Sequence, residues 1–226
     1  RFLANMEKFE VNDQLGKGAQ GVVYLVTEKN GGKKWALKKI ECKDESEANK
    51  AYKEMSALEC LQQHPYLCPY KEYFVSYDKS LSAMFVSVLT EYFPKGDMAK
   101  ILADKREKSE GLDEQVIKKW LGQIIEAMMF VHKRKIIHRD LKPSNVFITE
   151  DDSVAIGDFG VLTVMRDIRT KTRAAVGSMN WMSPEVLERA YDELSDVWSL
   201  GCILLELAST AFTDNATMGG KLCEIK

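Results

Sequence analysis

The chain has 226 residues, of which 45% are hydrophobic and 29% are charged. This composition excludes a disordered tail, and the length excludes a disulfide-stapled miniprotein but allows one large domain or two small ones. A formal net charge of -2 gives no global attraction to nucleic acid or to an anionic membrane, so neither is an expected partner.

Strand-like patterns dominate the beginning of the chain. Apolar residues within 9–39 fall into short runs, which glycine turns at Gly16 and at Gly31-Gly32 separate. Short apolar runs divided by glycine turns are typical of hairpins. The sequence therefore predicts an antiparallel meander.

One helix and two further strands are expected next. Residues 45–63 are charged and alanine-rich, with apolar residues at helical spacing, and the proline after His64 stops this pattern. Strands are predicted within 73–75 and 83–90, and the periodicity then breaks at residues 94–96. A boundary between two lobes is expected at this break.

The character of the chain changes beyond residue 93. An apolar stripe predicts a helix of about five turns, and it consists of Val116, Trp120, Leu121, Ile124, Met128 and Val131. A small β lobe over 9–92, followed by a larger α-rich lobe over 93–226, makes a bilobal α+β arrangement. The cleft of such an arrangement is a usual place for a small-molecule site.

The cysteines and the apolar runs bear on location. The five cysteines are odd in number and contain no C-x-x-C pair, which argues against a disulfide framework and favours a reducing compartment. The longest apolar runs are interrupted by Glu126 and Glu206, and no secretory signal is recognisable. We therefore expect a soluble intracellular protein, cytoplasmic or nuclear.

Residues 16–21 fit the pattern G-x-G-x-x-G, whose glycines let backbone N–H groups approach phosphate oxygens. Taken alone, the pattern also fits an ordinary glycine-rich hairpin. The segment lies between two predicted strands, whereas a dinucleotide-binding fingerprint opens a helix after a strand. Dinucleotide binding is therefore disfavoured.

Lys38 lies on the next predicted strand, where alternation places it on the same face as Ala36. A lysine buried there needs anionic partners, and Glu54 on the predicted helix could supply one. The alternative is that both are solvated surface charges.

The strongest chemical signal is His-Arg-Asp-Leu-Lys-Pro-Ser-Asn over 138–145, followed 13 residues after Asn145 by Asp158-Phe159-Gly160. A carboxylate, an ammonium and a carboxamide within six positions, with a second carboxylate nearby, can hold metal ions and orient a hydroxyl nucleophile. His138 follows two isoleucines, which favours a packed, hydrogen-bonded histidine over a catalytic base.

In this order and spacing the motifs resemble the eukaryotic protein kinase domain, over about Phe9 to Leu207. The resemblance implies that Lys38, oriented by Glu54, contacts the α- and β-phosphates of ATP. It implies that Thr90 is the gatekeeper and that the backbones of Glu91 and Phe93 hydrogen-bond adenine. Asp97 would hold the ribose or a basic substrate residue, and Phe147 would form the floor of the adenine site. The full set placed against ATP is Leu15, Gly16, Lys17, Gly18, Ala19, Gln20, Gly21, Val22, Val23, Ala36, Lys38, Thr90, Glu91, Phe93, Asp97 and Phe147.

The same resemblance assigns the catalytic roles. Asp140 would accept or orient the proton of a substrate hydroxyl, and Lys142 would neutralise charge on the γ-phosphate. Asn145 and Asp158 would hold Mg²⁺. The implied activity is transfer of the γ-phosphoryl group of Mg-ATP to a protein substrate.

The type of kinase is indicated by finer features. The Asp-x-Lys-x-x-Asn arrangement resembles serine/threonine kinases, and residues 145–148 and 182–185 look most like the NIMA-related kinases. The serine/threonine kinase-like domain-containing proteins share that affinity. Val161, directly after Asp-Phe-Gly, implies a preference for threonine as phosphoacceptor.

Two positions depart from the family pattern. Ala174 stands where many members carry a phosphorylated Ser or Thr, and Thr172 is the nearest substitute. The alternative is that Thr172 is an ordinary loop residue and no activating phosphate is needed. Met179-Asn180-Trp181 replaces a more usual Pro-x-Tyr, so substrate docking is expected to differ.

The end of the chain is the largest departure. Only about 25 residues follow Gly201, and no arginine follows Arg189 to pair with Glu185 as the family pattern requires. We therefore expect a truncated or incompletely represented domain of low thermal stability.

Two other classes of protein remain as alternatives. The first is a pseudokinase or scaffold that binds nucleotide or partners with little catalysis, although retention of the lysine, the glutamate and the catalytic-loop residues argues against it. The second is a small-molecule kinase of similar fold, which the long segment 161–185 disfavours because it would form a polypeptide-binding ledge.

Overall fold

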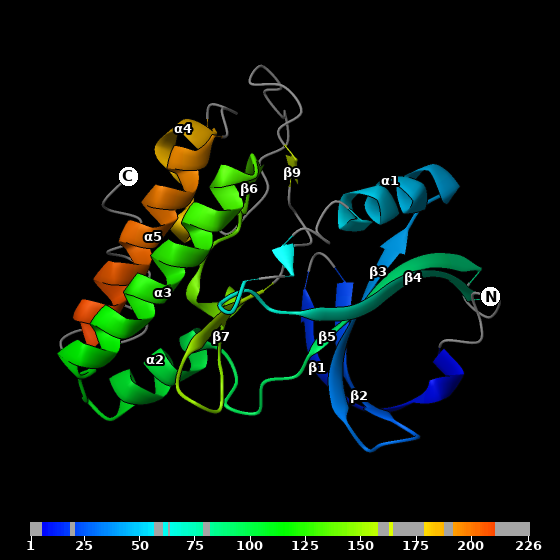
Figure 1. The fold of residues 1–226 in the computed structure, drawn as a ribbon, viewed down its shortest axis with the longest axis horizontal. Helices are drawn as coiled ribbons and strands as arrows, with labels where there is room; N and C mark the ends of the chain where they lie inside the picture. The colour runs from blue at the N-terminus through cyan, green and yellow to red at the C-terminus, as the bar shows by residue number, and fades with distance from the viewer. Residues whose placement is uncertain are drawn as a thin grey trace. The chain divides into compact units, whose positions relative to one another are not determined.

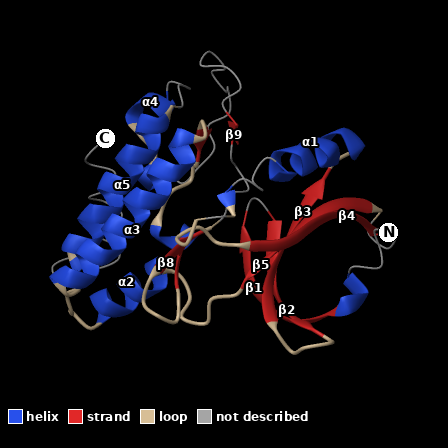
Figure 2. Cartoon of the chain, viewed as in Figure 1, coloured by secondary structure: helices blue, strands red, loops and turns tan. Residues whose placement is uncertain are grey.

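A computed structural model describes residues 6–18, 21–56, 61–62, 64–78, 82–157, 163–164, 179–187 and 192–210. The chain divides into two compact units (Figures 1 and 2). The first comprises Arg1–Gln63 with Cys68–Tyr92, and the second comprises His64–Leu67 with Phe93–Lys226. The first is built on a β-sheet and the second mainly on helices, as the sequence predicts.

The first unit is a five-stranded antiparallel sheet with the strand order β1-β2-β3-β5-β4. Its elements are η1 (Met6–Lys8), β1 (Phe9–Gly18), β2 (Gly21–Glu28), β3 (Lys34–Cys42), α1 (Glu45–Ser56), β4 (Tyr70–Asp78) and β5 (Ala83–Glu91). The predicted meander over 9–39 is therefore correct, whereas the strand predicted at 73–75 is longer than expected. The first twelve residues of the helix predicted over 45–63 are described as α1.

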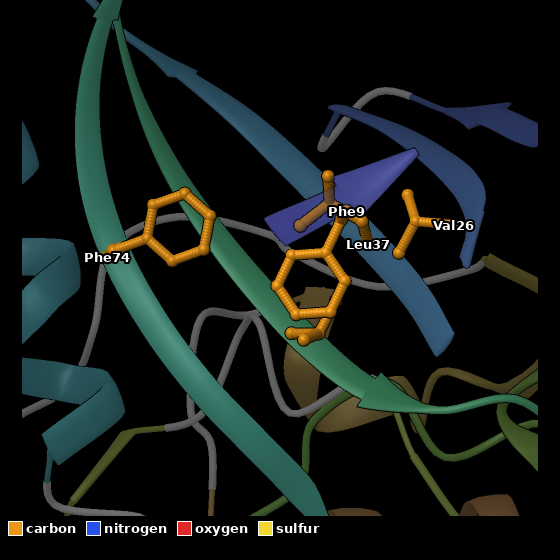
Figure 3. Close-up of a cluster of buried hydrophobic side chains, with 5 residues drawn as sticks. Phe9, Val26, Leu37 and Phe74 are labelled. Carbon is orange, nitrogen blue, oxygen red and sulfur yellow. The ribbon is translucent and has the colours of Figure 1, made fainter. Parts of the chain in front are cut away.

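One face of this sheet is closed by an apolar cluster that strand alternation creates. Phe9, Val26, Leu37, Phe74 and Leu89 are each at most 9% exposed and come from all five strands. Figure 3 shows four of these side chains gathered between the strands. Since neighbouring residues on a strand point to opposite faces, burying Leu37 here sends Ala36 and Lys38 to the other face.

Helix α1 packs against β3, β4 and β5. Its Ala48 is buried with Cys42 and Val86, and Ile40 packs against them. Ile40 lies two residues from Lys38, so α1 covers the continuation of the face that carries Lys38. This arrangement brings α1, the helix of Glu54, to the lysine's side of the sheet.

The backbone of the β1–β2 hairpin requires a glycine at position 21. Its φ is +131°, and a Cβ atom there would collide with the carbonyl oxygen of Lys39. We expect Gly21→Ala to lower the free energy of unfolding by about 2–4 kcal/mol, through strain and overpacking. Gly16→Ala is the matched control, because a Cβ at Gly16 has no atom within 4 Å, and should change it by less than about 0.5 kcal/mol. Equal losses in urea unfolding would contradict this.

The second unit contains four helices among its described residues. They are α2 (Met98–Glu107), α3 (Glu114–Lys133), α4 (Pro184–Leu187) and α5 (Glu193–Ala208). Short strands and turns lie between them: β6 (Ile136–Ile137) pairs with β9 (Thr163–Val164), β7 (Val146–Ile148) pairs with β8 (Val154–Ile156), and η3 (Pro143–Asn145) and η5 (Met179–Trp181) are single turns. The apolar stripe predicted for one long helix is buried in α3, where Trp120, Ile124, Met128 and Val131 face the core.

Residues 64–67 belong to the helical unit although they precede two strands of the sheet. Leu67 forms a β-bridge with Ile156, whose backbone N–H donates to the carbonyl of Tyr66 at 2.9 Å. The ring of His64 packs against Phe130 of α3 with a centroid distance of 4.7 Å. The sequence predicts only a helix stop at these residues. In the structure, residues 64–67 are an anchor, a segment that packs against α3 and pairs with β8 of the helical unit.

His64 should make the stability of this anchor depend on pH. Burial lowers its pKa below the usual 6.5; Glu126 opposes this shift and Arg134 adds to it. The folded protein therefore binds fewer protons than the unfolded chain below pH 6.5, so stability decreases as the pH falls through this range. We expect His64→Asn to show a smaller loss of unfolding free energy than the unaltered protein between about pH 7.5 and about pH 5.5. Equal losses would contradict the assignment.

Three further observations bear on the predicted thiols, on membrane spans and on Glu185. Cys42, Cys68 and Cys202, the cysteines within the described residues, are free thiols. No helix in the described part of the chain is long and apolar enough to cross a membrane. Glu185 is half-buried and forms no ion pair with another described residue.

Candidate functional site

The glycine pattern lies on the β1–β2 hairpin. Gly16 pairs with Val23, Lys17 with Val22, and Gly18 with Gly21, so that residues 19 and 20 connect the two strands. Both connecting residues, Ala19 and Gln20, lie outside the described residues. The loop lies between two strands, as predicted, and Leu15 at its start is 44% exposed.

The strand register aligns the other residues assigned to nucleotide binding in this unit. Val23 lies opposite Lys38, which lies opposite Val88, and Ala36 lies opposite Thr90. Directly opposed residues of antiparallel strands point to the same face, so these side chains share one side of the sheet. The Thr90 hydroxyl donates to the carbonyl of Ala36 at 3.4 Å.

Cys68 is a neighbour of Thr90 that the sequence analysis did not single out. Burial raises the pKa of the Cys68 thiol to about 12, with Glu91 adding to the shift and a hydrogen bond from Thr90 opposing it. The thiol is therefore protonated at neutral pH and is a poor nucleophile.

Several assigned residues of the helical unit meet at the start of α2. The ring of Phe93 stacks on that of Phe147, with centroids 5.4 Å apart and planes at 14°. The backbone of Asp97 forms an antiparallel β-bridge with that of Phe147. The Asp97 carboxylate accepts a hydrogen bond from the backbone N–H of Lys100 at 2.9 Å. Asp97 therefore caps α2, which is a structural task that the sequence analysis did not foresee.

The catalytic-loop residues form a connected polar group. Lys142 Nζ donates to Asp140 Oδ2 at 2.8 Å, and the amide nitrogen of Asn145 donates to the same oxygen at 3.1 Å and to the Asp140 carbonyl at 2.7 Å. Asp140 and Asn145 are buried, at 6% and 5% exposure. A carboxylate held by an ammonium and a carboxamide in this way is positioned to act on a hydroxyl proton.

His138 has the structural role that its apolar neighbours predict. It is fully buried, its Nε2 lies 3.0 Å from the Gly157 carbonyl, and its Nδ1 accepts from the N–H of Asp140 at 3.3 Å. The tautomer with the proton on Nε2 satisfies both contacts. His138 thus orients the backbone of Asp140 and does not act as the base.

Asp196, in the first turn of α5, holds the backbone of the catalytic loop. Its carboxylate accepts from the N–H groups of His138 and Arg139, each at 2.9 Å, and lies 2.8 Å from Nε2 of His132. Arg139 has a φ of +69°, a conformation that is uncommon for a residue with a side chain. These contacts keep the loop in that conformation.

The remaining assignments lie beyond what the structure describes. Asp158, expected to bind metal, and Val161 and Thr172 are outside the described residues, as is the side chain of Glu54. Within the described ranges, no group of three His, Cys, Asp or Glu side chains has metal-binding geometry. Asn145 fits a hard cation, because its amide oxygen is a ligand type that Mg²⁺ prefers.

A buried polar group that was not expected from the sequence joins α2, η5 and α5. Glu206 Oε2 lies 3.0 Å from Nη2 of Arg106, and Glu206 Oε1 accepts from Nε1 of Trp181 at 2.7 Å. Glu206 is visible in the sequence as the charge that interrupts an apolar run. Its partners could not be identified there, because Arg106 is 100 residues away.

An antiparallel sheet with a glycine hairpin and a lysine-bearing strand, and a helical unit that carries an Asp-Lys-Asn group, are the parts that the resemblance to protein kinases predicts. The family model described as "Protein kinase domain" matches residues 9–220. The chain therefore belongs to the protein kinase domain family. The predicted α+β kinase fold and the resemblance to protein kinases are confirmed.

Curated relatives place the chain near the NIMA-related kinases. It is 36% identical over 205 residues to the serine/threonine-protein kinase Nek6 of Oryza sativa subsp. japonica, which is 89% of this chain and 36% of that protein. It is 32% identical over 223 residues to the probable serine/threonine-protein kinase nek2 of Dictyostelium discoideum, covering 96% and 52%, and 32% identical over 207 residues to the serine/threonine-protein kinase Nek1 of Mus musculus, covering 90% and 16%. The predicted similarity to this group is confirmed, and the chain spans between about a sixth and a half of these relatives.

Proposed function

We propose that the protein transfers the γ-phosphoryl group of Mg-ATP to serine or threonine hydroxyls of protein substrates. The observation that carries this proposal is the Asp140-Lys142-Asn145 group, in which Asp140 and Asn145 are buried and hydrogen bonds hold the carboxylate in place. Membership of the protein kinase family and similarity to serine/threonine kinases support the same activity.

Each residue of the group has a distinct task in this proposal. Asp140 orients the substrate hydroxyl and receives its proton, and Lys142 neutralises negative charge on the phosphoryl group in transfer. Asn145 and Asp158 would hold Mg²⁺, which supplies positive charge to the phosphate oxygens. Lys38 and the backbone of 16–21 position the phosphates in the sheet unit.

A pseudokinase or scaffold is not favoured. Lys142 and Asn145 both donate to Asp140 Oδ2, and these two contacts fix the orientation of the Asp140 carboxylate. A scaffold would have no physical need for a buried carboxylate beside an ammonium, since burying charge is costly. We infer that this cost is retained because the group catalyses a reaction.

Finer parts of the proposal rest on the resemblance. Threonine is the preferred phosphoacceptor because of Val161, and the substrates are proteins of an intracellular compartment, cytoplasmic or nuclear. The acceptor preference is tested by comparing kcat/KM for one peptide that carries either Thr or Ser. A preference for serine would refute it.

The experiment that tests the activity combines binding and transfer. Thermal unfolding of the purified protein is followed with ATP alone and with Mg-ATP, and phosphate transfer from γ-labelled ATP to a Thr peptide is then measured. Magnesium-dependent stabilisation with transfer is expected. Stabilisation without transfer would favour a nucleotide-binding scaffold, and a folded protein with neither property would refute the proposal.

A further inference from the structure

The segment that begins the helical unit at Phe93 is folded into a tight turn. The backbone N–H of Gly96 donates to the Phe93 carbonyl at 3.0 Å, and Gly96 has a φ of +78°. Pro94 and Lys95 are the two central residues of this turn, and both are exposed. Proline is favoured at the first central position of a common turn type, and glycine at its last position. The residues of turn 93–96 therefore favour its local conformation.

Strand β7 holds this turn on one side. The N–H of Ile148 donates to the Gly96 carbonyl at 3.0 Å, and Asp97 forms a β-bridge with Phe147. The rings of Phe93 and Phe147 are stacked, with centroids 5.4 Å apart. Phe93 and Phe147 are residues that the resemblance to protein kinases places against adenine. The position of turn 93–96 on β7 therefore sets the geometry of the part of the adenine site that lies in the helical unit.

Lys95 holds the same turn through a second contact. Its Nζ donates to the carbonyl of Glu150 at 2.8 Å and to Asp152 Oδ1 at 2.6 Å. The Lys95 side chain is 38% exposed, whereas that of Asp152 is 72% exposed. An ion pair with so exposed a carboxylate contributes little free energy, so the backbone carbonyl of Glu150 is the more important acceptor. This acceptor is present whatever side chains the β7–β8 turn carries.

The β7–β8 turn that accepts this hydrogen bond is itself fixed to α3. Lys119 Nζ donates to the carbonyl of Asp151 at 3.1 Å, and the indole N–H of the buried Trp120 donates to the carbonyl of Asp152 at 3.0 Å. Gln123 adds hydrogen bonds to the two residues that follow Asp152. A side chain that binds the β7–β8 turn is therefore attached to a fixed support.

We propose that Lys95 is a positioning residue for nucleotide binding, which binds the Glu150 carbonyl and thereby fixes turn 93–96 so that Phe93 is held in place beside Phe147 and adenine. The proposal rests on the nucleotide-binding part of the proposed function. Lys95 acts in it on the affinity for the nucleotide and not on the transfer step, which belongs to Asp140 and its partners.

Lys95→Met tests this proposal, because methionine keeps most of the aliphatic stem and removes the ammonium group. We expect the KM for ATP and the Kd for Mg-ATP to increase about fivefold, the upper end of what a partly exposed charged contact contributes. The kcat and the KM for a Thr peptide should stay within about twofold, since the catalytic group is not touched. Lys95→Arg retains N–H donors for the same carbonyl and should recover most of the affinity.

Lys105→Met is the matched control. Lys105 belongs to α2 of the same unit, its side chain is 36% exposed, and its Nζ forms an ion pair with Glu110 at 2.7 Å. The control removes an equivalent surface contact that does not involve turn 93–96. Its KM for ATP should therefore equal that of the unaltered protein. Both variants should unfold at nearly the same urea concentration, because exposed pairs contribute little to stability.

Adenosine distinguishes positioning of the adenine site from a direct contact between Lys95 and phosphate. It carries the base and the ribose but no phosphate group. If Lys95 positions the adenine site, Lys95→Met should weaken the binding of adenosine by the same factor as that of Mg-ATP in isothermal titration calorimetry. A loss of affinity for Mg-ATP alone would show that the ammonium group attracts the phosphates, and it would overturn the positioning role.

The remaining outcomes separate this proposal from the proposed function. If the unaltered protein neither binds Mg-ATP nor transfers phosphate, both are refuted. If it binds Mg-ATP without transfer, only the kinase function is refuted, because the Kd comparison does not require transfer. Unchanged affinities in Lys95→Met would overturn the role of Lys95 alone. The same loss of affinity in Lys105→Met, or an equal increase in the peptide KM, would also overturn it, since it would indicate general loosening of the fold.

Discussion

Replacement of Asp140 with asparagine is expected to lower kcat for phosphoryl transfer by about 10²- to 10⁴-fold, the range associated with losing a positioned acid or base. The carboxamide has nearly the same shape but cannot accept the substrate proton. Its amide nitrogen would also face the donors Lys142 and Asn145, which now bind a carboxylate oxygen at 2.8 and 3.1 Å. Steady-state kinetics with a Thr peptide measure the effect.

The control for this prediction is Asp152→Asn. Asp152 belongs to the β7–β8 turn of the same unit, has a φ of +60° that asparagine tolerates, and forms an exposed ion pair with Lys95. Its replacement should leave kcat unchanged. Activity of Asp140→Asn within tenfold of the unaltered protein would show that Asp140 is not the catalytic carboxylate.

The largest effect on stability is expected for Asp196→Ala. The change leaves the buried backbone N–H groups of His138 and Arg139 without their acceptor. Each such orphaned donor costs about 1–3 kcal/mol, so the free energy of unfolding should decrease by about 2–6 kcal/mol. That is a large part of the ~5–15 kcal/mol of a typical domain. Urea unfolding measures the loss.

Asp192→Ala is the control on the same helix. Asp192 caps α5 by accepting from the N–H of Leu194 at 2.8 Å, and it is exposed to solvent. Loss of an exposed cap costs about 1 kcal/mol. If the two variants were destabilised equally, the contacts of Asp196 with the catalytic loop would not be an important source of stability.

Local patterns explain why much of the fold could be predicted. The glycine turns and short apolar runs act over a few residues, and they correctly indicated the antiparallel strands. The apolar stripe of α3 repeats within one helix, and the structure buries it as predicted. Asp140, Lys142 and Asn145 lie within six positions, so their proximity required only a turn, which η3 supplies.

Contacts between distant segments were not predictable in the same way. The anchor at 64–67 joins the helical unit through Ile156 and Phe130, and nothing in its own residues indicates these partners. The resemblance implied a ribose or substrate contact for Asp97, and the structure shows that Asp97 also caps α2. That role depends on where the helix begins, which periodicity defines poorly.

The sequence by itself determined the family, the order of the two units and the proximity of Asp140, Lys142 and Asn145, because these depend on residue types at short, fixed spacings. Only the tertiary structure decided which partners the buried charge of Glu206 acquires. Glu206 meets Arg106 across 100 residues and Trp181 across 25 residues. A buried carboxylate requires donors, but the chain's path through space selects them, and no local pattern encodes that path.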